Sequence, residues 1–319
     1  MVGLIGDIGG TNARFALVEA DGSVHSVLPL TCGHYPTLAD ACEDYLARIP
    51  HKEKPRHGAL AVASPILGDE IKLTNLHWTF SVEATRERLG LTKLEVVNDF
   101  VAAALAIPHL PADGVVKIGQ GEAASGAPIW AVGPGTGLGA AALVWTGMHW
   151  MPLSSEGGHM TIAAANDREA EILSVLRRRV GHVSAERVVS GPGLVNLYSA
   201  IAQLADREVE AGLLPAHVSE RGLSRSCPLC VETLDVFASM LGTVASDLAI
   251  MLNARGGLYI AGGVVPRLMP WFASSGFRAR FEQKGRFSDF LAAVPTYVIM
   301  QPLPALTGLA ALVTATERR

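Results

Sequence analysis

The chain has 319 residues, of which 49% are hydrophobic and 18% are charged, and its formal net charge is −4. This length predicts about two domains, and the apolar content is sufficient for large buried cores. The small negative charge and the lack of a basic stripe argue against a nucleic-acid partner. The first residues lead directly into a strand-like run, so we expect no secretory signal and a cytoplasmic protein. Four cysteines in a chain of this size fit reduced thiols better than a disulfide framework.

A first glycine loop lies in the stretch IGDIGGTNARFAL, residues 5–17. It lacks the lysine of a P-loop and the glycine spacing of a dinucleotide-binding turn. Strand-like runs at 13–20 and 23–30, joined by an Asp-Gly turn, predict a β-meander around the loop. Gly9 and Gly10 would allow backbone N–H groups to approach an anion, and Asp7 at the strand end suits a hydrated magnesium ion. An ordinary hairpin turn is the alternative, and this loop alone favours neither.

A second glycine loop repeats this arrangement between Trp130 and Trp145. Four alternating glycines separate two apolar strand-like runs, and no helix signal follows. No charged residue lies between Glu122 and Glu156, which raises the alternative of a membrane span. We reject it because the glycines and Pro134 would leave backbone polar groups unsatisfied in lipid, so we expect no membrane partner. One such hairpin in each half of the chain predicts two related domains that face each other across a nucleotide.

Asn98 and Asp99 follow a buried-strand run at 94–97 and precede an alanine-rich helix that we predict from Val101 onward. They therefore lie at the carboxyl end of a strand, where open α/β sheets bind ligands. A helix N-cap is the alternative role for Asp99. Capping would explain one polar residue at this position but not the adjacent pair.

Two further segments of the second half carry polar residues that a ligand could use. Glu156 and His159 flank a Gly-Gly pair, which disfavours a helix, so we predict a loop that presents both side chains. A structural hydrogen bond is the alternative for His159. Glu186 follows Ser184, a possible cap of a short helix, and by itself is best explained as a solvated acid in a first helical turn. A second helix is predicted from Gly191 to Ala202.

The pair Cys227 and Cys230 forms a single C-x-x-C motif. A structural zinc site needs a second pair of ligands, and no thioredoxin-like strand precedes the motif. We therefore expect these cysteines to be structural or incidental and to bind no metal.

The motifs together resemble those of the bacterial glucokinase family, which belongs to the superfamily of sugar kinases, actin and heat-shock ATPases. The resemblance is carried, in chain order, by GDIGGTNAR, NDF, GPGTGLG, SEGGH, HVSAERVVSGPGLVNLY and LYIAGGVVPR. Each motif alone is weak, but the ordered set is specific and extends from Gly6 to about Phe287. The chain lacks the cysteine-rich zinc motif of the related repressor-and-kinase family, which favours the zinc-free branch.

The resemblance implies a two-lobed, actin-like (ribonuclease-H-like) α/β fold with a nucleotide and sugar cleft. A small lobe would span 1–109 and be completed by an amphipathic helix within 301–319, and a large lobe would span 110–300. The implied activity is ATP-dependent phosphorylation of D-glucose at its C6 hydroxyl, with Mg²⁺, in a homodimer. A kinase for another hexose or an N-acetylhexosamine, a sugar sensor of low turnover, and a chaperone or filament ATPase are the alternatives.

The resemblance also assigns roles to individual residues. Those for ATP binding are Gly6, Asp7, Ile8, Gly9, Gly10, Thr11, Asn12, Gly135, Thr136, Gly137, Gly262 and Gly263. Those for sugar binding are Asn98, Asp99, Glu156, His159 and Glu186. Asp99 would also be the catalytic base, and Asp7 would hold Mg²⁺ through a water molecule.

Overall fold

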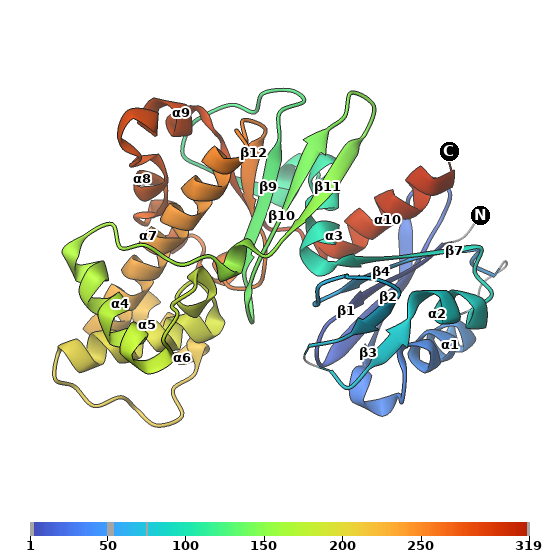
Figure 1. Ribbon diagram of the computed structural model, residues 1–319, viewed down its shortest axis with the longest axis horizontal. Helices are drawn as coiled ribbons and strands as arrows, with labels where there is room; N and C mark the ends of the chain where they lie inside the picture. Colours follow the sequence, from blue (N-terminus) through green and yellow to red (C-terminus); the bar gives the residue numbers. More distant parts are fainter. Residues whose placement is uncertain (1–2, 50–53, 75, 318–319) are drawn as a thin grey trace. The chain divides into compact units, whose positions relative to one another are not determined.

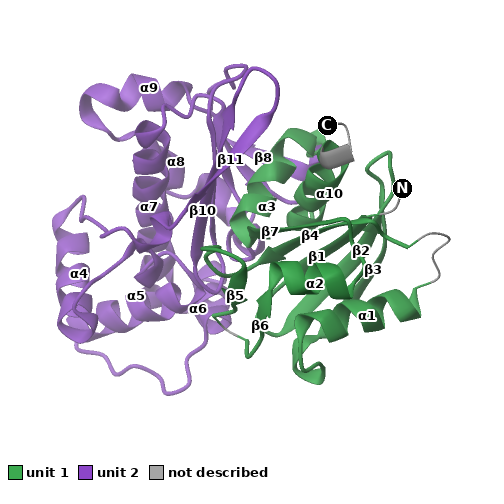
Figure 2. Ribbon diagram, turned by 45° about the vertical axis from the view of Figure 1, so that its right-hand side comes forward, with its two compact units in different colours: residues 1–112, 301–319 green, residues 113–300 purple. Residues whose placement is uncertain are grey.

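The computed structural model describes residues 3–49, 54–74 and 76–317. The chain folds into two compact units, of which unit 1 comprises residues 1–112 and 301–319 and unit 2 comprises residues 113–300 (Figure 2). The first segment of unit 1 therefore ends at residue 112, and the sequence placed this boundary at 109.

Unit 1 is built on a five-stranded mixed sheet. Its strands, in spatial order, are β3 (Val24–Thr31), β2 (Asn12–Val18), β1 (Gly3–Ile8), β4 (His57–Val62) and β7 (Lys93–Asn98). The first three form the predicted antiparallel meander, and β1, β4 and β7 run parallel. The register aligns Ile8, Val62 and Asn98, so the three parallel strands end side by side. The residues that follow these strands are thereby brought to one edge of the sheet.

Helices cover both faces of this sheet (Figure 1). They are α1 (Leu38–Arg48) and α2 (Val82–Arg88) on one face, and α3 (Asp99–Ala106) and α10 (Pro304–Glu317) on the other. Side chains alternate along a strand, so Leu4 and Ile8 join the core under α1 whereas Ile5 joins the core under α3 and α10. The C-terminal helix thus belongs to unit 1 and packs against α3.

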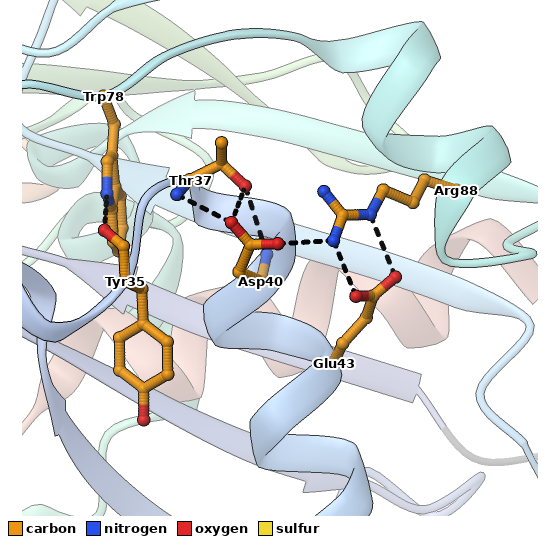
Figure 3. A network of polar contacts seen from close by, with 6 residues as sticks. All are labelled: Tyr35, Thr37, Asp40, Glu43, Trp78 and Arg88. Carbon is orange, nitrogen blue, oxygen red and sulfur yellow. Dashed lines mark hydrogen bonds and ion pairs between the residues drawn. The ribbon is translucent and has the colours of Figure 1, made fainter.

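Polar contacts join α1 to α2, and separately the Trp78 indole donates to the carbonyl of Tyr35, which precedes α1 (Figure 3). Thr37 and Asp40 form a capping box at the start of α1, and Arg88 of α2 contacts the carboxylates of both Asp40 and Glu43. The short strands β5 (Glu70–Lys72) and β6 (Thr79–Ser81) form a hairpin, and Trp78 beside it is buried. Leu73, Thr74 and Leu76, between these two strands, line a small pocket together with Gly9 and Gly10 of the first glycine loop.

Unit 2 contains a six-stranded mixed sheet with helices packed against it (Figure 1). Its strands, in spatial order, are β11 (Trp150–Ser155), β10 (Leu138–Trp145), β9 (Ile129–Pro134), β12 (Gly257–Ile260), β13 (Thr296–Ile299) and β8 (Val115–Ile118). Strands β9 and β10 form the predicted glycine hairpin. The uncharged stretch that raised the membrane alternative is therefore mainly β-sheet.

The helices of unit 2 form a layer around one long central helix, α7. They are α4 (Asp167–Val180), α5 (Gly191–Leu204), α6 (Pro215–Leu223), α7 (Pro228–Met251), α8 (Phe277–Glu282) and α9 (Ser288–Ala293). Helix α7 is long and apolar enough to cross a membrane by length and composition alone, but 67% of its most apolar stretch is buried against the rest of the protein. It contacts α5, α6 and α8, and this packing accounts for its apolar composition.

Short 3₁₀ helices complete the chain. They are η1 (Cys32–His34), η2 (Ile107–His109), η3 (Ala112–Gly114), η4 (Gly157–His159), η5 (Ala185–Arg187), η6 (Val265–Leu268), η7 (Trp271–Ser274) and η8 (Gly285–Phe287). Two of the sequence predictions need correction here. The loop predicted around Glu156 contains η4, and the helix predicted from Val101 begins two residues earlier, at Asp99.

Candidate active site

The first glycine loop connects β1 to β2 in a tight turn. The Gly9 N–H donates to the Asn12 carbonyl at 3.0 Å, while Gly10 and Thr11 between them are exposed. No helix follows the loop, so any anion bound there would meet backbone N–H groups of a turn. Gly6 and Ile8 are buried within the sheet, and Gly6 leaves room for the ring of Phe15.

Hydrogen bonds from residues that the sequence patterns did not single out hold this loop in place. Cys32 donates its backbone N–H to the Thr11 carbonyl at 2.9 Å and its thiol to the Gly9 carbonyl at 3.6 Å. Burial raises the pKa of Cys32, so its thiol remains protonated and able to donate. Tyr35 donates its N–H to the Cys32 carbonyl and accepts a bond from the Trp78 indole (Figure 3). No local sequence signal marks these residues, because their role depends on contacts between distant segments.

Asp7 lies at the end of β1 beside the loop. Burial raises the pKa of its carboxyl group, and the Arg14 guanidinium, 3.9 Å from Oδ2, partly opposes this shift. The negative charge of this carboxylate is only partly balanced by Arg14. Such a carboxylate suits a cation that keeps water and phosphate oxygens as its other ligands, as Mg²⁺ usually does. Within the described ranges no group of three or more His, Cys, Asp or Glu side chains could hold a metal ion. The Asp7 carboxylate therefore fits a magnesium ion that brings most of its own ligands.

We expect Asp7→Asn to raise the melting temperature of the ligand-free protein while weakening its apparent Mg²⁺ affinity by about 10–100-fold. A raised carboxyl pKa means that the folded state favours the protonated form, so ionisation of Asp7 destabilises the fold as pH rises. The stability gain of Asp7→Asn should be absent at acidic pH and should appear as pH rises through the pKa of the folded state. Melting curves of both proteins across this pH range measure it. Equal melting temperatures at neutral pH would contradict the prediction.

Asn98 and Asp99 stand at the junction of β7 and α3. The Asn98 side chain accepts the Phe100 N–H at 2.9 Å and is the N-cap of α3, whereas Asp99 is the first helical residue. The N-cap alternative for Asp99 is therefore wrong, because Asn98 occupies that position. Asp99 Oδ1 also lies 2.9 Å from the same N–H, which fixes the orientation of its carboxylate at the edge of the sheet.

A further pair of polar residues, which the sequence analysis missed, comprises Ser64 after the central parallel strand β4 and Thr74 after β5. Ser64 follows β4, between the ends of β1 and β7, and is 3% exposed. Its hydroxyl accepts the Thr74 N–H at 2.9 Å and lies 3.1 Å from the Thr74 hydroxyl. Thr74 lines a small pocket with Gly9 and Gly10. The order of the parallel strands could have indicated Ser64, because β4 lies between β1 and β7 and its last residues therefore lie between the ends of those two strands.

In unit 2 the second glycine loop is attached to neighbouring segments at several points. Within the loop, the Gly135 N–H donates to the Gly137 carbonyl at 2.8 Å. The Val264 N–H donates to the Pro134 carbonyl at 3.2 Å, which places Gly262 and Gly263 next to the loop. Gly262 has a φ of +82°, and a side chain there would overlap the Pro134 carbonyl, so close approach requires glycine. The glycines of this half to which the resemblance assigned nucleotide binding are thus adjacent. Thr136 is exposed at the tip of the loop.

The three predicted sugar residues of unit 2 converge around Leu138, which begins β10. Glu186 Oε2 accepts the Leu138 N–H at 3.0 Å, and Gly158 lies so close that a side chain would overlap the Leu138 carbonyl. Glu156 and His159 bracket that glycine; their side chains are 58% and 61% exposed and 4.0 Å apart. Among the described residues His159 has no other side-chain partner, so a structural hydrogen bond does not explain it. Both side chains are available to a ligand.

The cysteine pair lies away from these segments, at the start of α7. Cys227 is half-buried and Cys230 is buried, and burial together with the neighbouring Cys227 raises the pKa of Cys230 to about 12. Such a thiol is a poor nucleophile and metal ligand at neutral pH.

Comparisons with known proteins identify the family to which the chain is similar. The family model described as Glucokinase matches residues 4–316. The glucokinase of Paramagnetospirillum magneticum is 50% identical over 98% of this chain and 97% of its own length. The crystal structure of a glucokinase from an Antarctic psychrotroph is 40% identical, covers 98% of this chain and 99% of that one, and superimposes with a TM-score of 0.90.

A more distant structure shares the fold. The glucokinase of Balamuthia mandrillaris, solved in complex with glucose, is 21% identical, covers 98% of this chain and 93% of that one, and has a TM-score of 0.81. The predicted α/β fold of a two-lobed sugar kinase is thereby confirmed. The extent of the family match and the identity of the relatives show that the chain belongs to the glucokinase family.

Proposed function

We propose that the chain transfers the terminal phosphoryl group of ATP to the C6 hydroxyl of D-glucose, giving glucose 6-phosphate and ADP. The observation that carries this proposal is the near full-length match to the glucokinase family, together with 50% identity to a curated glucokinase. The geometry of both units supports it, because the exposed or half-buried members of the predicted set, such as Gly10, Thr136 and Glu156, lie in loops or at strand ends.

Asp99 is the base of the proposed reaction. It lies at the carboxyl end of a parallel strand and at the start of a helix, and its carboxylate is oriented by the Phe100 N–H. Phosphoryl transfer to a hydroxyl is loose and depends mainly on positioning and charge, so the base is needed late, when the hydroxyl proton must leave. In this role Asp99 orients the C6 hydroxyl and then accepts its proton.

The remaining sugar residues recognise hydroxyl groups. Asn98, Glu156, His159 and Glu186 combine amide, carboxylate and imidazole groups, which can pair with hydroxyls as donors or acceptors. A site that pairs a hydroxyl discriminates strongly against a sugar that lacks it or presents it elsewhere. This set therefore supports a hexose as substrate, and the match to the glucokinase family supports glucose.

The two glycine loops bind the nucleotide. The exposed residues Gly10 and Thr11 in the first loop, and the exposed Thr136 and half-buried Gly137 in the second, can turn backbone N–H groups to phosphate oxygens. Asn12 lies beside the first loop, at the start of β2. Gly262 and Gly263 have no side chains, so the adenosine can approach the backbone at these two residues. Mg²⁺, when bound, neutralises charge on the β- and γ-phosphates, and Asp7 would hold it through a water molecule.

We further propose that the protein acts in the cytoplasm as a homodimer, without a nucleic-acid or membrane partner. A kinase for another hexose or an N-acetylhexosamine is the alternative with the same machinery, and a sugar sensor would retain binding with little turnover.

ADP release across a panel of sugars, with a no-sugar control, tests the proposal. We expect rapid ADP release with glucose, slower release with its epimers and N-acetylated derivatives, and very little without sugar. Faster turnover with another sugar would replace glucose as the substrate. Turnover independent of sugar would indicate an ATPase, and binding of glucose without turnover would indicate a sensor.

A further inference from the structure

One carboxylate of unit 2 connects two parts of the proposed site. Glu186 Oε2 accepts a hydrogen bond from the Leu138 backbone N–H at 3.0 Å, although the two residues are 48 positions apart in the chain. Leu138 is the first residue after the turn of the second glycine loop, and it is 6% exposed. The other oxygen of Glu186, Oε1, has no hydrogen-bond partner among the described residues. The side chain is half-buried, so this oxygen can still meet a ligand.

The glycine loop is shaped to admit this carboxylate. A Cβ at Gly137 would overlap Glu186 Oε2, so an alanine there would move the carboxylate from the position in which it accepts the Leu138 N–H. Gly135, two residues earlier in the same loop, differs in this respect, because a Cβ there would meet nothing within 4 Å. Neither glycine has a positive φ. The requirement at residue 137 is therefore for space beside the glutamate.

The segment that carries Glu186 holds the loop at a second point. Ser190 donates its hydroxyl to the Glu186 carbonyl at 2.7 Å and accepts the Gly193 N–H at 3.0 Å, which caps α5. The Gly191 N–H at the start of α5 donates to the Gly135 carbonyl at 2.8 Å. The glycine loop is thus bound to the residues around Glu186 on both sides of its turn, at Gly135 and at Leu138.

We propose that Glu186 couples sugar binding to the conformation of the second phosphate-binding loop, so that glucose and ATP each strengthen the binding of the other. The inference rests on the proposed function, in which Glu186 binds a sugar hydroxyl. A hydroxyl that engages the carboxylate restricts its rotation and holds Oε2 on the Leu138 N–H, which keeps the loop in one conformation. A nucleotide that selects this conformation must raise the affinity for sugar by the same factor, because coupling between binding sites is reciprocal.

The matched pair Gly137→Ala and Gly135→Ala tests this coupling. Calorimetry measures the glucose affinity without nucleotide, and the affinity for the non-hydrolysable analogue AMPPNP, with Mg²⁺, with and without glucose. In Gly137→Ala the new methyl group displaces the carboxylate, so we expect glucose to bind about tenfold more weakly without nucleotide. The gain in AMPPNP affinity caused by glucose should also shrink towards onefold. Gly135→Ala has the same change in the same loop and should bind glucose without nucleotide as the unaltered protein does.

Substitutions of Glu186 provide the complementary test. Glu186→Gln keeps a carbonyl oxygen that can accept the Leu138 N–H, so it should retain most of the coupling even if glucose binds more weakly. Glu186→Ala should abolish the coupling. A melting temperature for each variant separates these effects from loss of fold.

Two results would overturn the inference: equal glucose affinities of Gly137→Ala and Gly135→Ala, or the same coupling in Glu186→Ala as in the unaltered protein. Failure of the proposed function would be recognised separately, because the unaltered protein would then release no ADP with glucose and ATP, whether or not it binds the sugar.

Discussion

We expect Asp99→Asn to lower the turnover number by about 10²- to 10⁴-fold while glucose binding weakens far less. The amide has nearly the shape of the carboxylate and can still form a hydrogen bond with the C6 hydroxyl. It cannot accept the proton that this hydroxyl must lose. The expected rate loss corresponds to about 3–5 kcal/mol in the activation barrier.

Stability should change little in this variant. Asn98 is the N-cap of α3 and remains in place, and an asparagine at residue 99 can still accept the Phe100 N–H. Turnover, glucose affinity by calorimetry and melting temperature should be measured on one preparation.

Ser81→Ala is a suitable control for this measurement. Ser81 caps α2 by accepting the Ala84 N–H at 3.0 Å in the same unit, so its loss costs about 1 kcal/mol of stability without touching the site. Near-normal turnover of Asp99→Asn would refute the base assignment. A rate loss no larger than that of the control would do the same.

The local sequence predicted the parts of the site that depend on strand ends and glycine turns. Apolar runs followed by Gly-Gly or Asn-Asp locate β1 and β7, and both loops lie where these patterns placed them. The start of α3 was predicted two residues late, because the pattern was read from the apolar helix face rather than from its cap. At Asn98 the signal for the end of a strand coincides with the signal for a helix cap, and this residue is both the N-cap of α3 and a candidate ligand.

The supporting contacts could not be predicted in this way. Cys32, Ser64 and Glu186 are ordinary residues in their local context, and each acts through a partner between 10 and 48 residues away in the chain. Glu186 is the clearest example, since its position after Ser184 predicts only a solvated acid. Its bond to Leu138 depends on the packing of η5 beside β10, which is a property of the tertiary fold.

The second large effect concerns the C-terminal helix. Gly308 lies in α10 where that helix crosses α3, and a Cβ at this position would overlap the Ala102 carbonyl oxygen of α3. Because the obstructing atom belongs to the backbone, no side-chain rotation can relieve the contact. The helices would have to separate, in a core that also contains Ile5 and Leu309.

We therefore expect Gly308→Ala to destabilise the protein by about 2 kcal/mol or more, as overpacked cores do. This sign is opposite to that of helix propensity, which favours alanine over glycine by about 1 kcal/mol. Ala311→Gly in the same helix measures the effect of helix propensity alone, and it should lower the free energy of unfolding by about 1 kcal/mol. Urea unfolding of the three proteins measures the differences.

The effect of Gly308→Ala should also extend to catalysis, because α3 begins with Asp99. A displacement of α3 moves the proposed base relative to the phosphate loop after β1, and positioning errors of about 1 Å can cost 10²-fold in rate. We expect the turnover number of the folded variant to fall well below that of Ala311→Gly at equal fraction folded. If Gly308→Ala is as stable as the unaltered protein and equally active, α3 and α10 are not in the close contact that orients Asp99.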